Sequence, residues 1–588
     1  MQPLVLRLHF YAGVLIAPFL LVAAVSGTLY AATPQIEEAL YRHQLHVTPS
    51  ATQLPLAEQI QTAVDARGGQ EPVAVCPAPS TSDTTRVLFS DPTLGESERA
   101  AVFVDPGTGE VRGELTVYGT SGVLPLRTWV DQLHRNLHLG EPGRLYSELA
   151  ASWLWVLALS GLGLWVARQA TARRAARAAG AEGGSTVSRE DNGGTTRRVL
   201  TPGLTPGLTG ARGSRGRTRT LHAVVGTWIA VGLVALSATG LTWSTYAGTR
   251  VTDLRSALSW DTPAVDTALP GAPVGTTDNA ASSATGGHEG HAGHESHGGH
   301  AGHEGQEGHA VPSGNPGVTE AESTGETSPS TSAVTTAAAA SGSVVTPAAF
   351  AAVLATAREA GLTAGKIEVK APTEAGAAWK VDEIDRGLHT QVDSAAIALT
   401  PTSTSTGTST GTSTGQVLDG QVLDGQVLDG QVLDGQVLDV VRFSDYPLMA
   451  KLARWGIDLH MGSFGLGNQL ALLALGLGLS AVIVWGYRMW WQRRPDPTQR
   501  LAVGPPAHRG AWRHLPKPLL AIVVVVTVAL GWALPLLGIS LLVFLAVDVV
   551  LSLIHHTRAR RGGGLSSTTP TSPTTTASAL TSTSRRTS

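Results

Sequence analysis

The chain has 588 residues, of which 42% are hydrophobic and only 15% are charged, well below the roughly 25% of an average soluble protein. This deficit argues against an ordinary cytosolic enzyme, and the net charge of −3 gives no sign of nucleic-acid binding. The single cysteine, Cys76, excludes an intrachain disulfide, a Cys-based zinc site, a four-thiolate iron–sulfur cluster and covalent haem. Metal chemistry therefore falls to the 19 histidines.

Six stretches are apolar for about the 20 residues that a helix needs to cross a bilayer. They lie at 8–30, 147–167, 221–246, 465–488, 518–535 and 537–555. The first is longer than the core of a secretory signal and lacks a clear cleavage site, so we interpret 1–30 as a retained anchor. The sequence predicts a mainly α-helical membrane protein with a C-terminal transmembrane hairpin at 518–555.

Charge sets the expected orientation, because basic loops stay in the cytoplasm. The loop 168–220 has eleven Arg and three acidic residues, and 489–517 has six Lys or Arg and one Asp. The tail, 556–588, has five Arg and no acid, whereas 247–459 has ten basic and 25 acidic residues. We therefore expect both termini in the cytoplasm and two segments, 31–146 and 247–459, outside.

Each outer segment is expected to form one small α+β domain. In the first, the pattern predicts a helix at 56–66, strands at 72–76, 85–90 and 100–104, and then a turn at 105–110 before a final strand. In the second, it predicts a helix at 347–360 and strands at 366–370, 378–383, 391–399 and 440–443.

The second outer segment also has three low-complexity insertions, which we expect to be disordered. They are a Gly/His tract at 287–309, a Ser/Thr/Ala-rich stretch at 318–345, and 401–439, which ends in five tandem copies of Gly-Gln-Val-Leu-Asp. Five short copies are too few to bury the core of a repeat fold, so we interpret them as an expanded surface turn.

The first and third spans repeat one pattern, in which His9 and His222 are 213 positions apart. Further pairs match at the same interval: Leu8/Leu221, Gly13/Gly226, Ile16/Ile229, Ala17/Ala230, Ser26/Thr239 and Gly27/Gly240. The second and fourth spans agree just before they begin, where 137–143 matches 459–465. We infer a duplication, in which each half is a helix, an outer domain and a second helix, and the four helices form a core.

This arrangement gives each membrane face a pair of histidines: His9 and His222 inside, and His460 with His134 or His138 outside. Histidine near a membrane helix is costly unless it is used. Hydrogen bonding or anchoring would explain any single one, but pairs on both faces favour ligation. Imidazole is a strong axial ligand of iron, and without CxxCH the haem would be b-type.

Nearby small residues (Gly13, Ser26, Gly27, Gly140, Gly226, Gly240 and Gly462) would let a flat macrocycle approach the helices. His134 and His138 are four positions apart, so together they could instead bind one Zn or Cu. We favour one of them as a haem ligand, and the duplication, which aligns His138 with His460, favours His138.

At these residues the chain resembles the PepSY-associated transmembrane helix family, which includes iron-regulated membrane proteins and siderophore-iron reductases of bacteria. The matching motifs are 8–27, 133–137 leading into 161–165, 221–241, and 459–462 leading into 485–495. The resemblance implies a bacterial inner-membrane protein with two PepSY domains outside and, in the reductase members, two b haems on intramembrane histidines. The family's LHxxL histidine matches His134, in tension with the internal alignment.

The Gly/His tract is a flexible run of candidate ligands for Cu(II), Ni(II) or Zn(II). Its histidines are His288, His291, His294, His297, His300, His303 and His309. We interpret the tract as a metal buffer rather than a catalytic centre.

Two functional hypotheses follow. The first is a diheme b-type membrane reductase that moves electrons outward to ferric (siderophore) iron or Cu(II). The sequence has no Rossmann fingerprint or flavin domain, so its donor would be a quinol or a separate reductase protein. The alternative is a non-enzymatic membrane protein for metal binding or regulation.

Overall fold

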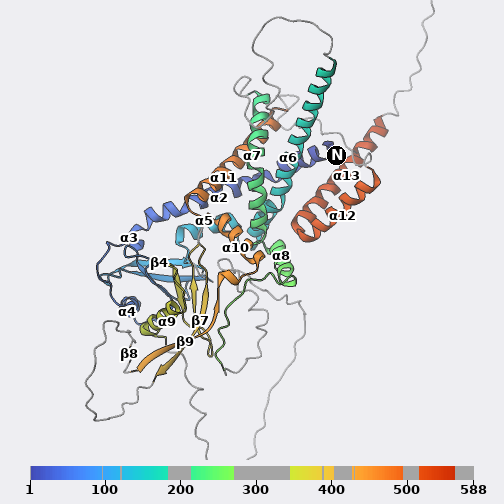
Figure 1. The fold of residues 1–588 in the computed structure, drawn as a ribbon. Coiled ribbons are helices and arrows are strands. Elements are labelled where there is room, and N and C mark those ends of the chain that lie inside the picture. The colour runs from blue at the N-terminus through green and yellow to red at the C-terminus, as the bar shows by residue number, and fades with distance from the viewer. Residues whose placement is uncertain are drawn as a thin grey trace, which may run out of the picture.

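The computed structural model describes residues 2–95, 97–119, 122–182, 214–270, 345–386, 390–402, 427–428, 431–493 and 516–562 (Figure 1). The histidine-rich tract, with its seven predicted metal ligands, lies outside these residues. So do most of the Ser/Thr-rich stretch, the first repeat copies, parts of both basic loops and the tail after 562.

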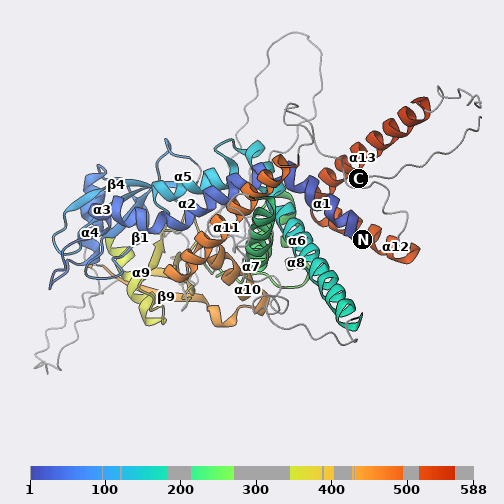
Figure 2. The same cartoon turned by 90° about the horizontal axis from the view of Figure 1, so that it is seen from above.

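Among the described residues, four helices are long and apolar enough to cross a membrane. They are α2 (Ala17–Leu40), α6 (Glu141–Glu182), α7 (Arg215–Leu241) and α11 (Leu466–Trp491). In the bundle α6 packs on α7, and α11 packs on both α2 and α7. The sheet lies at one end of this bundle (Figures 1 and 2).

The first span begins with α1 (Gln2–Leu15), which is separated from α2 by a break at Ile16. The cause is Pro18, which has no N–H to donate to the carbonyl of Val14 four residues before it. A side chain from α11 replaces the lost donor, because the Tyr487 hydroxyl donates to the Val14 carbonyl at 2.8 Å. The neighbouring helix thus supplies a donor for the carbonyl that Pro18 leaves without one.

The C-terminal helices α12 (Lys517–Ala533) and α13 (Pro535–Gly562) form a hairpin beside the bundle (Figure 1). Trp153 of α6 donates its indole N–H to Ser540 Oγ of α13 at 2.9 Å. Their apolar segments, Lys517–Ala533 and Pro535–Leu551, are shorter than the four spans. Of the six expected spans, four are therefore found at full length among the described residues.

The strands of the two outer segments join in one antiparallel sheet rather than two. In chain order they are β1 (Pro72–Cys76), β2 (Thr85–Phe89), β3 (Glu98–Val104), β4 (Val111–Tyr118), β5 (Ile367–Lys370), β6 (Trp379–Glu383), β7 (Ser394–Thr402), β8 (Val427–Leu428) and β9 (Gln431–Val441). The sheet order is β4-β3-β2-β1-β5-β6-β7-β9-β8. The join is β1 with β5, where Val75 pairs with Val369. β1 and β5, the first strands of the two outer segments, thus each cover the edge that the other would expose.

Two helices, α4 (Leu56–Ala66) and α9 (Pro347–Glu359), pack side by side on one face of this sheet. Alternate strand residues point to the same face, and those facing the helices are apolar. The resulting core includes the fully buried Ile60, Phe89, Phe350 and Trp379. Both helices were predicted from the sequence and are confirmed.

The last two pentapeptide copies form most of β9, so the interpretation of the repeat as a surface turn is wrong there. Five is an odd number, and strand side chains alternate between faces, so equivalent residues of successive copies face opposite sides. Leu433 packs against the core under α9, whereas Leu438 packs with Val265 on the other face. The repeat can therefore supply an apolar residue to each face of a strand.

Five short helices connect the bundle and the sheet. They are α3 (Arg42–Leu45), α5 (Pro125–Asn136), α8 (Thr245–Ala257), the single turn η3 (Phe443–Asp445) and α10 (Leu448–Met461). α5 leads directly into α6, and α10 leads into α11. The ends of α5 and α10 therefore lie where the bundle meets the sheet.

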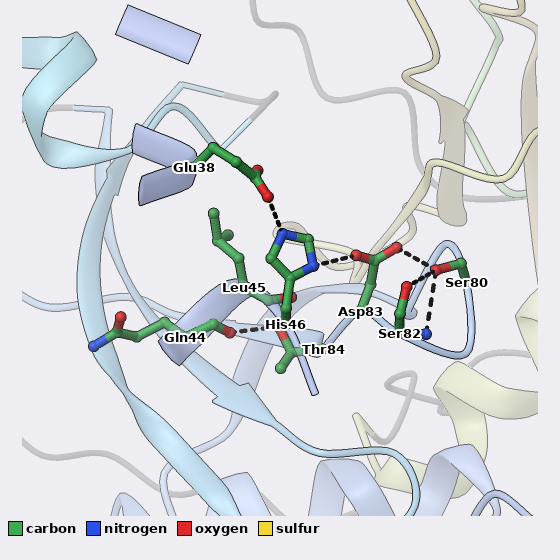
Figure 3. A network of polar contacts seen from close by, with 8 residues as sticks. All are labelled: Glu38, Gln44, Leu45, His46, Ser80, Ser82, Asp83 and Thr84. Atoms are coloured by element: carbon green, nitrogen blue, oxygen red, sulfur yellow. Dashed lines mark hydrogen bonds and ion pairs between the residues drawn. The ribbon is translucent and has the colours of Figure 1, made fainter. Parts of the chain in front are cut away.

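Two neighbouring acidic residues anchor the end of α2 in different ways. Glu37 is only 2% exposed, and it pairs with the Arg127 guanidinium at 2.6 Å and accepts the Arg127 backbone N–H at 3.0 Å. Glu38 is exposed and contacts His46 Nε2 at 2.5 Å, while His46 Nδ1 lies 3.0 Å from Asp83 (Figure 3). The first pair holds α2 to α5, and the second network holds it to the β1–β2 loop.

We expect Glu37→Ala to destabilise the protein by about 3 kcal/mol, because Arg127 would be left half-buried without its partner. Glu38→Ala is the matched control. It should lower the free energy of unfolding by no more than about 1 kcal/mol, as for other exposed ion pairs. Unfolding in detergent, followed by near-UV circular dichroism, measures both. Equal losses would show that the Glu37–Arg127 pair does not fix α5 on α2.

Candidate functional site

His9 and His222 face one another across a cavity at the end of the bundle away from the sheet. They lie on α1 and α7, and their ring centroids are 6.4 Å apart with the rings nearly perpendicular, at 82°. α6 and α11 complete the walls, and the cavity has about 1470 Å³ of empty space. We call it the His9/His222 cavity.

A second cavity of about 1310 Å³ lies in the same bundle at the end nearer the sheet, and His134 and His460 both line it. These residues come from the last turns of α5 and α10, the two short helices that lead into α6 and α11. We call it the His134/His460 cavity. The Trp243 ring lies 5.7 Å from that of His460.

A layer of leucines separates the two cavities. Leu20, Leu154, Leu233 and Leu479, one from each core helix, line both of them. Leu20 and Leu233 are 213 positions apart, the interval that relates His9 to His222, and Leu154 and Leu479 are 325 apart. The layer is thus built of matching residues from the two halves of the chain.

Each of the four histidines has its Nδ1 atom hydrogen-bonded. His222 Nδ1 lies 2.9 Å from the carbonyl oxygen of Val482, so this nitrogen donates. The other three Nδ1 atoms contact hydroxyls whose own protons go to backbone carbonyls, so these nitrogens donate as well. The pairs are His9 with Ser160 (2.9 Å), His134 with Ser26 (2.9 Å) and His460 with Thr239 (2.7 Å). In every ring this tautomer makes Nε2 the metal-binding nitrogen.

A glycine of a neighbouring helix lies under each of these rings. A Cβ atom placed on Gly161 would be 3.1 Å from His9 Cε1, and one on Gly27 would be 3.1 Å from His134 Cε1. The corresponding distances are 3.5 Å from Gly240 to His460 and 3.7 Å from Gly486 to His222. Small residues at these four positions allow the imidazoles to lie against helix backbone.

His138 lies apart from the other candidates. It follows α5 with a positive φ of 56°, its side chain is exposed, and its ring rests on Trp129 at 5.0 Å. The described residues that line the two cavities do not include His138. The structure therefore gives His134, rather than His138, the position that corresponds to His460.

A better sequence frame for this pairing was available. Trp129 and Trp455 each precede a Leu-His pair by the same distance, giving the pattern W-x3-L-H at an interval of 326 positions. The LHxGxxG alignment, which pairs His138 with His460, instead matches the glycines near the junctions of α5 with α6 and of α10 with α11. The tryptophan was the missed signal, because Trp129 and Trp455 are the aromatic pair that α5 and α10 share at the interval that matches His134 with His460.

A larger chamber lies between the bundle and the sheet, with about 1990 Å³ of empty space. It shares Tyr30, Asp131, Trp243 and Met461 with the His134/His460 cavity. Its lining includes the cationic side chains Arg86, Arg127, Lys366 and Arg386 and the acidic side chains Glu37, Glu38 and Asp131. A polar molecule in this chamber would thus lie next to the His134/His460 pair.

No group of three or more His, Cys, Asp or Glu side chains in the described part of the chain has the geometry of a metal site. Burial raises the pKa of the Cys76 thiol to about 12, which disfavours the thiolate that metal binding needs. Each histidine pair therefore supplies two ligands at most. Such a pair suits a cofactor that brings the remaining metal ligands with it, as haem does.

The fold and the cavities define a membrane protein with a helical core, two stacked histidine-lined cavities and a sheet domain at one end. The family model described as the PepSY-associated TM region matches residues 6–493. The chain belongs to this family. No curated protein matches the chain.

Proposed function

We propose that this protein is a diheme b-type membrane reductase, with one haem held by His9 and His222 and a second held by His134 and His460. The fit of the first pair supports this. A metal held between the two imidazoles, with bonds of about 2 Å each and roughly 1 Å from each nitrogen to its ring centre, would need ring centroids about 6 Å apart. The observed separation is 6.4 Å.

The single observation that carries the proposal is the Nδ1 hydrogen bonding of all four histidines. A haem iron supplies one-electron redox chemistry when it is bound between two imidazoles. The chain's own residues fix the tautomer, orient each ring against a glycine and exclude water with an apolar wall. Gly13 and Gly226 line the His9/His222 cavity and have no heavy atom within 4 Å of an added Cβ, which leaves room for a flat ring.

The proposed orientation places the His9/His222 cavity at the cytoplasmic side of a bacterial inner membrane, with both termini inside and α12–α13 as a further transmembrane hairpin. The charge distribution supports it, because the basic loops join the bundle at that end. The matched intervals of 213 and 325 positions support the origin of the four-helix core and its two PepSY domains by duplication.

The two histidine levels mark the ends of the proposed electron route. From His9 to Gly27, against which His134 lies, there are 18 residues, or about 27 Å of helix. A haem held by His9 and His222 would be the one placed to accept electrons from a quinol or a reductase protein, and a haem held by His134 and His460, beyond the leucine layer, would be the one placed to deliver them outside. The acceptor, ferric (siderophore) iron or Cu(II), is reached through the chamber under the sheet, and the histidine-rich tract buffers Cu or another divalent metal outside.

Purified protein expressed with a haem supply tests the proposal. We expect a b-type spectrum after dithionite reduction, two haems per chain, and reoxidation by Fe(III)-citrate or Cu(II). In proteoliposomes with a reductant inside, an external Fe(III) chelate should be reduced. A colourless protein would overturn the proposal and favour the non-enzymatic role, in which deletion of 287–309 lowers metal tolerance.

A further inference from the structure

The middle of α6 and the C-terminal part of α11, with the turn that follows it, carry the same three-residue pattern. Gly161, Trp165 and Arg168 follow the spacing G-x3-W-x2-R, and Gly486, Trp490 and Arg493 repeat it 325 positions later. Positions i, i+4 and i+7 lie on the same side of a helix. In both helices the glycine lies under a histidine ring, so the tryptophan and the arginine point along the same cavity.

The structure places both arginines in the lining of the His9/His222 cavity. Arg168, Arg493 and Arg219 line it, together with both tryptophans. No Asp or Glu is among the described residues of its lining. The Arg493 guanidinium lies over the Phe10 ring at 5.6 Å. Burial lowers the pKa of Arg493, and the positive charges of Arg215, Arg168 and Arg219 lower it further. Three cationic side chains thus line this cavity, with no acidic side chain among its described lining residues.

An excess of Arg at a membrane-helix end is ordinary, because such residues set topology and extend to the interface. Arg173 of α6 is such a residue, since it is exposed and does not line the cavity. Arg168 and Arg493 differ from it in lining the same space as the two histidines. Like charges that converge there repel one another unless an anion joins them. A guanidinium fork binds carboxylates with two parallel hydrogen bonds.

We propose that Arg168 and Arg493 bind the carboxylates of the ligand that His9 and His222 hold, with the ligand's ring between Trp165 and Trp490. The inference rests on the proposed function, in which that ligand is haem and the carboxylates are its two propionates. The ligand is therefore planar and apolar with both anionic groups at one edge, and that edge faces the cytoplasmic end of the bundle.

The experiment measures haem release to apomyoglobin from full-length protein, for Arg168→Gln, Arg493→Gln, the double variant and Arg173→Gln. Each of the first two should release one of the two haems at least about tenfold faster, as expected for a lost hydrogen bond to a charged group. The double variant should release it faster still and lower its midpoint potential, because positive charge favours the reduced state. Arg168→Lys should restore the potential more than the release rate, since it keeps the charge but not the fork.

Unchanged release and potential in the double variant, with two haems bound, would overturn the inference and leave the proposed function standing. So would equal effects of Arg173→Gln. If the double variant instead lost only its binding to vesicles of anionic phospholipid, the arginines would be a lipid site, which also overturns the inference. Wild-type protein that binds no haem would overturn the proposed function itself, so the two failures are distinguishable.

Discussion

The double variant His9→Ala/His222→Ala should retain one of the two haems, and His134→Ala/His460→Ala should retain the other. In each case both axial ligands of one site are removed, while the second site lies beyond the leucine layer and keeps its own hydrogen bonds. Pyridine-haemochrome analysis should give one haem per chain in place of two. Both variants should lose transmembrane reduction of an external Fe(III) chelate in proteoliposomes by at least about 100-fold, because neither site can pass electrons alone.

His138→Ala provides the matched control, since it removes a histidine from the same short segment as His134. The His138 ring rests on Trp129 outside both cavities, so this variant should keep both haems and its reduction rate. Loss of a haem in His138→Ala with retention in His134→Ala would show that the LHxGxxG alignment, and not the cavity, identifies the ligand. Loss of both haems in every variant would point to general misfolding.

The sequence predicted the features that a residue pattern along the chain determines. Hydrophobic length placed the four core helices, and alternating apolar residues placed the strands at 72–76 and 367–370 within a residue or two of their observed ends. The constant interval of 213 positions placed His9 and His222 as partners. The helix and strand predictions depend on periodicity within a single segment, and the histidine pairing depends on one pattern that recurs at a constant interval.

The sequence did not predict which strands from distant parts of the chain pair with one another. Nothing local in Pro72–Cys76 or Ile367–Lys370 indicates that these strands are neighbours, because any two exposed strand edges of similar length can pair. The repeat was misread for a related reason. Its Gly and Asp residues are typical of turns, but its Val and Leu residues are held in strand β9 by pairing with β7, a contact that only the fold supplies.

The register error at His134 has a physical cause as well. Glycines at 140 and 462 have φ values of 63° and 78°, so they are required by backbone conformation after each short helix. They match between the halves as turn residues, but the turns differ in length: His460 is two residues before its glycine and His134 is six before its own. Matching glycines therefore shifted the histidines by one helical turn.

Gly161→Leu should remove the His9/His222 haem, which is the largest effect we expect from a residue that supplies no ligand atom. A Cβ at this position already comes within 3.1 Å of His9 Cε1, and the longer side chain would push the imidazole out of line with His222. Gly163→Leu is the matched control on the same helix, because Gly163 is exposed and an added Cβ meets nothing within 4 Å. Haem content should fall from two to one for Gly161→Leu and stay at two for Gly163→Leu.

Gly161→Ala gives the graded version of this test. Its methyl group is close enough to shift the ring by a few tenths of an ångström, so both haems should remain bound while the low-spin spectrum of one of them changes. Gly486→Ala should alter the spectrum less, because its Cβ would be 3.7 Å from His222 Cε1 rather than 3.1 Å. An equal loss of haem in Gly161→Leu and Gly163→Leu would mean that helix propensity or lipid packing, not contact with His9, explains the glycine.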